Sequence, residues 1–300
     1  MKDLPAKTKK RSSTAVAGIL FLIPGFVFIF IYMLYPLIYS FYLSFTSYNF
    51  AFDDEPTFIG FGNYADMWSD SYFMDAFRNT VFFSVAFLPL MMLLSLSIAL
   101  LINKGLRGTN FFRTSIFLPV IIPLSLTGII FQWVLNENYG LFNYFIRNVL
   151  NMPSWAHNWL TDERYAMWCI IFVSLWKFMG IEVILFIAGL QAIPNSIYEA
   201  ARIDGANSWK VLIHITLPNL RESYILTGVW AIIQAVKVYE QPVIMTGGGP
   251  GTSTLVLYQY VWKNAFNMYE MGYASSIGYI MGIIIALLTA LNFLINRTKD

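Results

Sequence analysis

Long apolar stretches alternate with short polar segments along this chain, and they predict helices that cross a membrane. Asp, Glu, Lys and Arg are absent from residues 12–52, 79–103, 114–136 and 271–296. Two more apolar stretches, 165–198 and 223–246, carry two charges each. A hydrocarbon core about 30 Å thick is crossed by about 20 residues of helix. The pattern therefore predicts six spans, at residues 15–40, 79–102, 114–135, 166–190, 223–245 and 272–295.

The composition of the 300 residues supports a membrane protein. Apolar residues make up 57%, charged residues 12% and aromatic residues 18%, with a mean hydropathy of +0.59. Soluble proteins carry about a quarter charged residues, so a soluble globular enzyme, a disordered chain and a repeat array are all excluded. A net charge of +2 does not indicate nucleic acid as a partner. A lone Cys169 excludes a disulfide scaffold, and the distant His157 and His214 argue against a metal site.

The distribution of Lys and Arg predicts the orientation. Most of the 19 basic residues fall on one side if the N-terminus is cytoplasmic, as the positive-inside rule requires. These residues are Lys2, Lys7, Lys9, Lys10, Arg11, Lys104, Arg107, Arg113, Arg202, Lys210, Arg221, Arg297 and Lys299. We therefore expect a cytoplasmic tail at 1–14, an all-α six-helix membrane domain at 15–295, and a second cytoplasmic tail at 296–300.

Two features qualify this topology. The first span could be a cleaved signal peptide, but its apolar run is longer than the usual apolar core and no small-residue cleavage site follows it. Pro89, Pro119 and Pro123 fall inside spans, where proline is expected to kink a helix.

The inner loop at 192–221 predicts a first short helix followed by a turn. Ser196 with Glu199 three residues later fits a capping box. Gly205 suits the left-handed position that ends many helices.

The same loop predicts a second helix, capped by Asn207 and running to about Thr216, where Pro218 ends it. A solvated connector is the plain alternative for such a loop. A helix pair is more than two spans need for their connection, so this loop is the strongest functional signal in the sequence.

The spacing of residues in this loop resembles the EAA motif of ABC-importer permeases, in which Glu-Ala-Ala is followed three residues later by Gly and then by a distal Ile-x-Leu-Pro. The matching segments are Glu199-Ala200-Ala201, Asp204-Gly205-Ala206 and Ile215-Thr216-Leu217-Pro218. Further segments resemble the carbohydrate branch of that family and its MalF-like subunits. They are Tyr35-Pro36, Ser44-Phe45-Thr46, Phe58 to Tyr64, Thr246 to Pro250 with Thr254, and Phe266 with Met271 to Ala274.

The resemblance implies that the loop docks in a cleft of a cytoplasmic ATPase dimer. The residues it implicates are Glu199, Ala200, Ala201, Asp204, Gly205, Ala206, Leu212, Leu217 and Pro218. The acids either contact the ATPase or only order the loop. Two departures stand out: Leu212 replaces the usual Phe, which weakens the expected fit, and Glu222 replaces a common Pro, which lets the fifth span start earlier.

Charged residues inside spans are the candidate solute pathway, because an unpaired charge in lipid is costly. Lys237 and Glu240 are three apart on one helix face, within a polar stripe of Gln234, Lys237, Val238 and Gln241. A location near the headgroups or against a second subunit is the plain alternative. Sugars need hydrogen-bonding groups and an aromatic face.

The resemblance places sugar contacts near one level of spans four and five. The resemblance implicates Trp176, Lys177, Phe178, Ile181, Ala231, Gln234, Ala235 and Val238. The span charges, the polar stripe and the aromatic residue next to Glu240 add Glu182, Lys237, Tyr239, Glu240 and Gln241. Several differ from maltose-type residues, so maltose is not the expected solute. The two lysines suit an acidic sugar, whereas Glu182 and Glu240 could simply neutralise them.

No Gly-x-x-x-x-Gly-Lys-Ser/Thr phosphate loop is present, so ATP and Mg belong to a partner ATPase and this chain binds no cofactor. The expected protein is a permease subunit in a bacterial cytoplasmic membrane. Its expected partners are a second permease, the ATPase dimer, an extracytoplasmic solute-binding protein, and a sugar or oligosaccharide. A self-contained secondary transporter that uses Lys177, Glu182, Lys237 and Glu240 is the main alternative. A membrane enzyme would need a cluster of acids, histidines or a nucleophile, which the sequence lacks.

Overall fold

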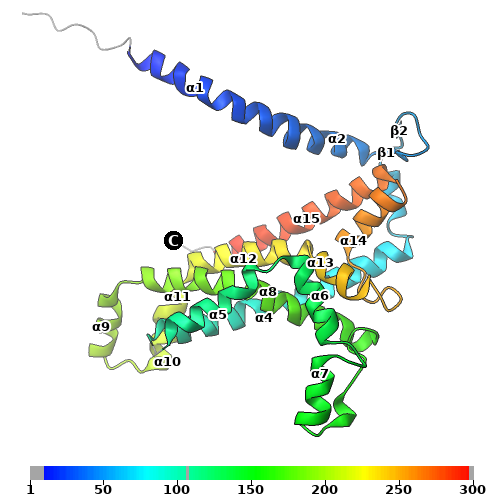
Figure 1. The fold of residues 1–300 in the computed structure, drawn as a ribbon. Coiled ribbons are helices and arrows are strands. Elements are labelled where there is room, and N and C mark those ends of the chain that lie inside the picture. The colour runs from blue at the N-terminus through cyan, green and yellow to red at the C-terminus, as the bar shows by residue number, and fades with distance from the viewer. Residues whose placement is uncertain (1–9, 106–107, 297–300) are drawn as a thin grey trace, which may run out of the picture.

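The computed structural model describes residues 10–105 and 108–296 of the chain (Figure 1). Lys2, Lys7, Lys9, Arg107, Arg297 and Lys299, which entered the orientation argument, lie outside the described residues. The helical elements are α1 (Lys10–Ile29), η1 (Phe30–Leu34), α2 (Tyr35–Leu43), α3 (Gly62–Asp66), α4 (Ser71–Asn103), α5 (Thr109–Ile121), α6 (Leu124–Val134), α7 (Leu141–Tyr144), η2 (Phe145–Val149), η3 (Pro153–Trp155), α8 (Glu163–Ala192), α9 (Asn195–Ile203), α10 (Ser208–Val211), η4 (Leu212–Thr216), α11 (Leu217–Asn219), α12 (Arg221–Val236), α13 (Glu240–Thr246), α14 (Leu257–Trp262), η5 (Lys263–Asn267) and α15 (Met271–Ile295).

Four helices in the described ranges are long and apolar enough to cross a membrane. They comprise Gly18–Leu43, Ser71–Asn103, Glu163–Ala192 and Met271–Ile295, and they match predicted spans one, two, four and six. The second span begins eight residues earlier than expected, because the Asp70 side chain accepts a hydrogen bond from the amide of Tyr72 and caps the helix there. Pro89 lies inside α4 without ending it.

Predicted span three is not one helix. It is divided into α5 and α6, which are bent by 101° at a short break. The break lies at Ile122 and Pro123, where both residues have extended ψ angles of 131° and 141°. Proline disfavours helical backbone in the residue before it, so Pro123 explains the interruption. Pro119 remains inside α5.

Predicted span five, 223–245, is also wrong as a continuous helix. Helix α12 ends at Val236, and α13 begins at Glu240 after a break that contains Tyr239 at φ −147° and ψ −59°. The 16 residues of α12 extend about 24 Å. Lys237 and Glu240 lie at the two sides of this break. The sequence-based prediction assigned both charges to one face of a continuous helix and therefore missed the break.

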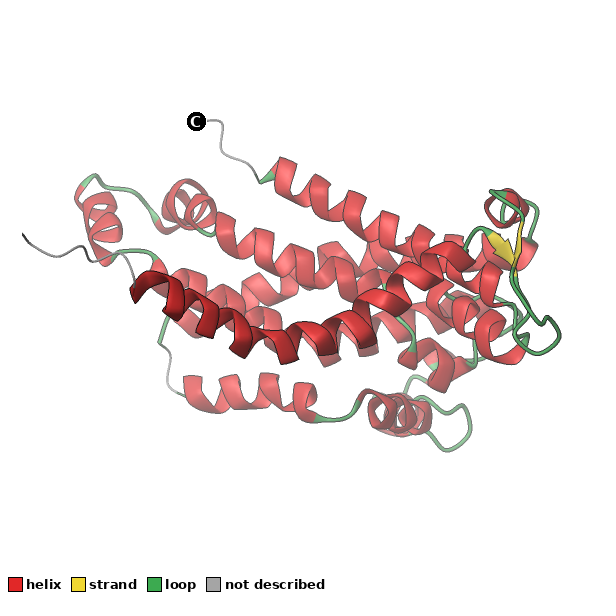
Figure 2. Ribbon diagram, turned by 90° about the horizontal axis from the view of Figure 1, so that it is seen from above, coloured by secondary structure: helices red, strands yellow, loops and turns green. Residues whose placement is uncertain are grey.

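The helices form a bundle in which α4 packs along α8, and α12 lies against both. Three buried apolar clusters lie between these helices. The α1–α2 helix diverges from the bundle and touches it only near α15 (Figures 1 and 2). Its apolar side chains from residue 19 to 42 are almost all exposed, including Phe21 at 87%.

One end of the bundle carries a small antiparallel sheet, β1 (Thr46–Ser47) with β2 (Thr57–Phe58), which the all-α prediction did not include. Buried Asn63 donates its side-chain amide to the carbonyls of Ser44 at 3.0 Å and Thr46 at 2.8 Å. The amide of Gly272, at the start of α15, donates to the Tyr48 carbonyl at 3.3 Å. Three segments that carry the family resemblance therefore meet here, and their contacts fix the end of α2 to α15. They are Ser44–Thr46, Phe58–Tyr64 and Met271–Ala274.

Candidate functional site

The predicted coupling loop forms a distinct helix pair at the opposite end of the bundle from the sheet (Figures 1 and 2). Helix α9 ends in a Schellman motif: the amide of Ala206 donates to the Ala201 carbonyl at 2.9 Å, and the amide of Gly205 donates to the Arg202 carbonyl at 3.1 Å. Gly205 has φ +74° and no atom within 4 Å of where a Cβ would stand. Glycine at this position therefore provides the left-handed backbone that reverses the chain.

Asn207 caps the second helix as predicted, because its Oδ1 accepts a hydrogen bond from the Lys210 amide at 2.8 Å. The predicted capping box at Ser196 and Glu199 is wrong. Helix α9 starts at Asn195, its N-cap is Pro194, and no side chain caps it. Proline supplies a favourable entry conformation without a hydroxyl.

Pro218 does not end the second helix. The helix continues through η4 into α11 and ends at Asn219, one residue after Pro218. Leu220 then links α11 to α12 and is fully buried. The loop is therefore joined to the fifth span without a flexible connector.

Exposure divides the predicted coupling residues. Ala201 is buried, and Ala206, Leu212 and Leu217 are partly buried; these four hold the helix pair together. The exposed members are Glu199, Ala200, Asp204, Gly205 and Pro218. No side-chain partner for Glu199 or Asp204 occurs in the described part of the chain, so their carboxylates face outward and do not order the loop.

Several predicted pathway residues lie together in the packed interior. Ala231, Ala235 and Val238 belong to one buried apolar cluster, with Phe178 packed against it. Trp176 is half-buried and contacts Phe131 edge-on, with 5.2 Å between ring centroids. Ile181 and Gln234 are also half-buried. In this conformation, side chains fill the level of spans four and five at which the sugar contacts were predicted.

Lys177 has a definite role in the fold. Its ammonium group donates to the carbonyls of Pro119 at 2.7 Å, Val120 at 3.1 Å and Ile122. These carbonyls lie at the end of α5. The Pro119 carbonyl also accepts from the Ile122 amide at 3.3 Å, whereas those of Val120 and Ile122 have no helical donor beyond the break. The buried lysine therefore holds the α5–α6 bend against α8.

Glu182 is fully buried on α8, and neither carboxyl oxygen has a hydrogen-bond partner among the described residues. The hydroxyl of Ser95 lies beside it but donates to the Met91 sulfur at 3.6 Å. Lys177 points to the α5–α6 break, so the two charges of this span do not pair.

Other buried polar atoms are also unpaired within residues 10–105 and 108–296: Ser174 Oγ, Trp230 Nε1 and Gln241 Nε2, among others. Buried polar groups are normally hydrogen-bonded, so this group is unusual. The sequence analysis missed Ser174 and Trp230, because a serine or tryptophan within an apolar span carries no distinctive signal.

The predicted polar stripe on span five does not exist, because the helix breaks within it. Lys237 is exposed at the end of α12, whereas Glu240 begins α13. The two therefore do not share a helix face. Tyr239 lies within the break and contacts Tyr258, with 5.1 Å between ring centroids.

The glycine-rich turn after α13 is tied to α4. Asn79 donates to the carbonyls of Thr252 at 2.6 Å and Leu255 at 2.9 Å, and the Thr252 hydroxyl donates to Asp75 at 2.7 Å. Thr254 donates to the Gly249 carbonyl at 2.8 Å. The turn is thus a structural element of this end of the molecule.

Asp70 ties three helices at the same end. Its Oδ2 accepts hydrogen bonds from the hydroxyls of Tyr260 at 2.6 Å and Tyr273 at 2.7 Å. Burial alone would raise the pKa of Asp70, but these bonds and those from two backbone amides lower the pKa below its ordinary value of 3.8. Burial and the bond to Asp70 raise the pKa of Tyr260.

The chain belongs to the family of binding-protein-dependent transport system inner membrane components, which it matches over residues 91–298. It is 35% identical over 268 residues to the probable ABC transporter permease protein YurN of Bacillus subtilis, covering 88% of this chain and 90% of YurN. It is 34% identical over 301 residues to the sulfoquinovosyl glycerol transport system permease protein SmoG of Agrobacterium fabrum, covering 100% of this chain and 96% of SmoG.

The fold is similar to a chain in the crystal structure of a bacterial alginate ABC transporter in complex with an alginate pentasaccharide-bound periplasmic protein. The TM-score is 0.82 at 20% identity, covering 97% of this chain and 98% of that chain. The resemblance drawn from the loop is therefore confirmed. This chain is an inner-membrane permease component of the ABC-importer type, and its relatives include sugar permeases.

Proposed function

We propose that this chain forms one half of the membrane pathway of an ATP-driven importer for a sugar or oligosaccharide in a bacterial cytoplasmic membrane. A second permease would supply the other half, and a separate ATPase dimer would hydrolyse ATP with Mg. An extracytoplasmic binding protein would deliver the solute. The names of SmoG and of the alginate transporter support a carbohydrate as the solute class.

The observation that carries the proposal is the exposed helix pair α9–α10. It presents the unpaired carboxylates of Glu199 and Asp204 at the far end of the bundle, and it is joined through buried Leu220 to α12. A displacement of this helix pair would be transmitted directly to α12, because no flexible segment lies between the pair and that helix. This end would face the cytoplasm together with both chain termini.

The topology we propose has six spans, with the bent pair α5–α6 as the third and the broken pair α12–α13 as the fifth. The proposed domain limits remain 1–14, 15–295 with the loop at 192–221, and 296–300. The exposed apolar surface of α1–α2 supports a second membrane subunit, since an unpartnered helix gains from packing against another.

The proposed solute pathway opens between the helices that now bury Ser174, Glu182, Trp230 and Gln241. Their unpaired polar atoms would meet sugar hydroxyls or water when the helices separate. Such a change is a shift between two conformations, biased by ATP-driven closure of the partner.

The test is to purify the chain with its second permease and ATPase, and to measure ATP hydrolysis in lipid with the binding protein and a panel of neutral and acidic oligosaccharides. Gly205→Arg should abolish sugar-stimulated hydrolysis, because it places a bulky side chain in a left-handed turn on the docking surface. We expect at least a tenfold loss, since each 1.4 kcal/mol lost at the interface is about tenfold.

Gly60→Arg is the matched control. Gly60 also has a positive φ, of +64°, with open space around it, but it lies near the sheet at the other end of the bundle. ATPase association should survive this change. If both arginine variants retain coupling, or if this chain transports solute without any ATPase, the proposed role of the loop is wrong.

A further inference from the structure

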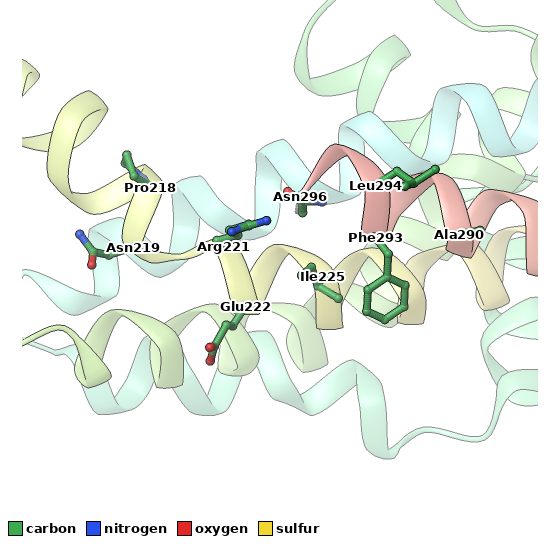
Figure 3. A pocket seen from close by; sticks show the side chains of 9 residues that line it. All are labelled: Pro218, Asn219, Arg221, Glu222, Ile225, Ala290, Phe293, Leu294 and Asn296. Atoms are coloured by element: carbon green, nitrogen blue, oxygen red, sulfur yellow. The ribbon is translucent and has the colours of Figure 1, made fainter. Parts of the chain in front are cut away.

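A groove between α12 and α15 opens at the same end of the bundle as the α9–α10 helix pair. Its volume is about 860 Å³. Figure 3 shows side chains from both helices directed into it. Nothing in the proposed transport cycle uses this groove, and it lies apart from the pathway residues on α8.

The groove exists because the two helices are held together at one level and separate beyond it. At the closed level, the side-chain amide of Asn292 donates to the Ile225 carbonyl at 3.0 Å. Gly228 allows this approach, since a Cβ there would lie 2.8 Å from the Asn292 side chain. One turn further along α15, Asn296 donates to the Asn292 carbonyl at 2.9 Å. The open end therefore has a polar rim.

The walls of the groove are amphipathic. Ile225, Phe293 and Leu294 supply apolar surface, and Phe293 and Leu294 are 52% and 65% exposed. Arg221 lies at the mouth, where its side chain extends toward α15 (Figure 3). Glu222 also lines the groove, but its carboxylate is directed away from α15 (Figure 3). Among the described residues, Arg221 has no acidic partner.

The free amides at the start of α12 add to the positive character of the mouth, and Glu222 in the same turn carries the one negative charge among the residues that line the groove. Arg221 is its first residue, and the first amide to donate back along the chain is that of Tyr224, to the Leu220 carbonyl at 2.9 Å. Amides in a first helical turn lack intrahelical acceptors and favour anions. A free cation, a helix start and an apolar wall thus converge on one groove.

We propose that this groove binds one anionic phospholipid of the cytoplasmic leaflet. The phosphate would lie at Arg221 and the first turn of α12, and an acyl chain would follow Ile225, Ala290 and Phe293. The proposal rests on the orientation given under the proposed function, which puts this end at headgroup depth. The apolar wall favours a lipid over a free phosphate ion, because a small ion would leave that wall in water.

The position of the groove gives such a lipid a regulatory consequence. Arg221 follows Leu220, which connects the coupling helices to the fifth span. A lipid bound there would hold α12 against α15 at the joint through which ATPase closure acts. Hydrolysis coupled to transport would then depend on anionic lipid.

The experiment is native mass spectrometry of the assembled transporter, released from nanodiscs that contain equal amounts of phosphatidylglycerol and phosphatidylethanolamine. Phosphatidylglycerol should be retained preferentially on this subunit. Arg221→Gln should lower its retention about fivefold, the effect expected for one basic residue near an anionic leaflet. Ala290→Trp should do the same by filling the groove without changing charge.

Arg113→Gln is the matched control. Arg113 is an exposed basic residue on α5 at the same end of the bundle and does not line the groove. Its loss should leave retention unchanged. Because the readout needs neither sugar nor ATP hydrolysis, failure of this proposal is distinguishable from failure of the transport proposal.

Three results would overturn the proposal. They are equal retention of phosphatidylglycerol by the wild type and both groove variants, equal retention of the two lipids by the wild type, and cross-linking of a cysteine at position 290 to another polypeptide in place of lipid. If Arg221→Gln fails to assemble, Ala290→Trp still decides, since it leaves the arginine in place.

Discussion

At the residue scale, the charged side chains inside the spans divide into two kinds. Lys177 satisfies three backbone carbonyls and supports a bend, whereas Glu182 is buried without a partner. The two are ionisable residues in one apolar helix, so their residue types alone do not separate them. What separates them is their surroundings in the fold: Lys177 lies beside the carbonyls at the end of α5, and Glu182 has no polar group of the described residues in hydrogen-bonding position.

Lys177→Met should destabilise the protein, because the Val120 and Ile122 carbonyls near the α5–α6 break would lose their donor. We expect a loss of about 1–3 kcal/mol, the cost of leaving buried acceptors unpaired. The measurement is the thermal unfolding midpoint of the purified complex, with Lys237→Met as a control because Lys237 is exposed. An unchanged midpoint with a raised KM for sugar would show that Lys177 is a solute ligand instead.

Asp70→Asn should destabilise the protein at pH 7 and have little effect in acid. The folded pKa of Asp70 is lower than its ordinary value of 3.8, so the carboxylate stabilises the fold above that pH. This stabilisation is lost as the pH falls through the folded pKa, where the wild type is protonated as well. The loss at pH 7 should be about 1 kcal/mol, because the Tyr260 and Tyr273 hydroxyls would donate to a neutral amide oxygen in place of a carboxylate, and hydrogen bonds to charged groups are stronger.

Thermal unfolding from pH 7 to pH 3 checks this expectation, with exposed Asp54→Asn as the reference. A difference between wild type and Asp70→Asn that stays constant over that range would contradict the assignment.

At the scale of elements, local chemistry identified turns better than breaks. The φ of Gly205 and the cap by Asn207 follow from residue types that have one strong structural preference. Pro123 was recognised as a kink for the same reason. The break at residues 237–239 contains no proline or glycine, but it begins at Lys237, and Pro242 follows in the first turn of α13. The sequence-based prediction interpreted the charges here as part of a polar stripe on one continuous helix.

Asn207→Ala should loosen the second coupling helix by about 1 kcal/mol, because the Lys210 amide loses its acceptor. Hydrogen exchange over residues 208–216 should accelerate about fivefold. Ser196→Ala should leave exchange in α9 unchanged, since no side chain caps that helix. Faster hydrogen exchange in the Ser196→Ala variant would contradict this assignment. It would show that the Ser196 hydroxyl does cap α9.

At the scale of the whole molecule, the family and the membrane class followed from the sequence, whereas the filled pathway and the separate α1–α2 helix did not. Apolar periodicity indicates which segments enter lipid, but it does not distinguish a lipid-facing side chain from one that faces another protein. Both surfaces are apolar, so their partners must be found from the structure or from the assembly.

Co-expression with the second permease should therefore stabilise this chain more than co-expression with an unrelated permease. A partner present at about 100 times its Kd would add about 3 kcal/mol. The two preparations can be compared by thermal unfolding in the same detergent. Equal midpoints would mean that lipid alone covers the exposed face of α1–α2.

The two breaks in the bundle have a joint mechanical consequence. Helix α6 follows one break and α13 follows the other, and the two short helices pack on each other. Each is attached to its longer neighbour by two or three non-helical residues. A tilt of the α6–α13 pair would therefore change only a few backbone dihedral angles and would rupture no hydrogen bond within a helix, but it would move the Ile122 carbonyl that Lys177 holds. Elastic compliance is concentrated at two points, while the segments between them remain stiff.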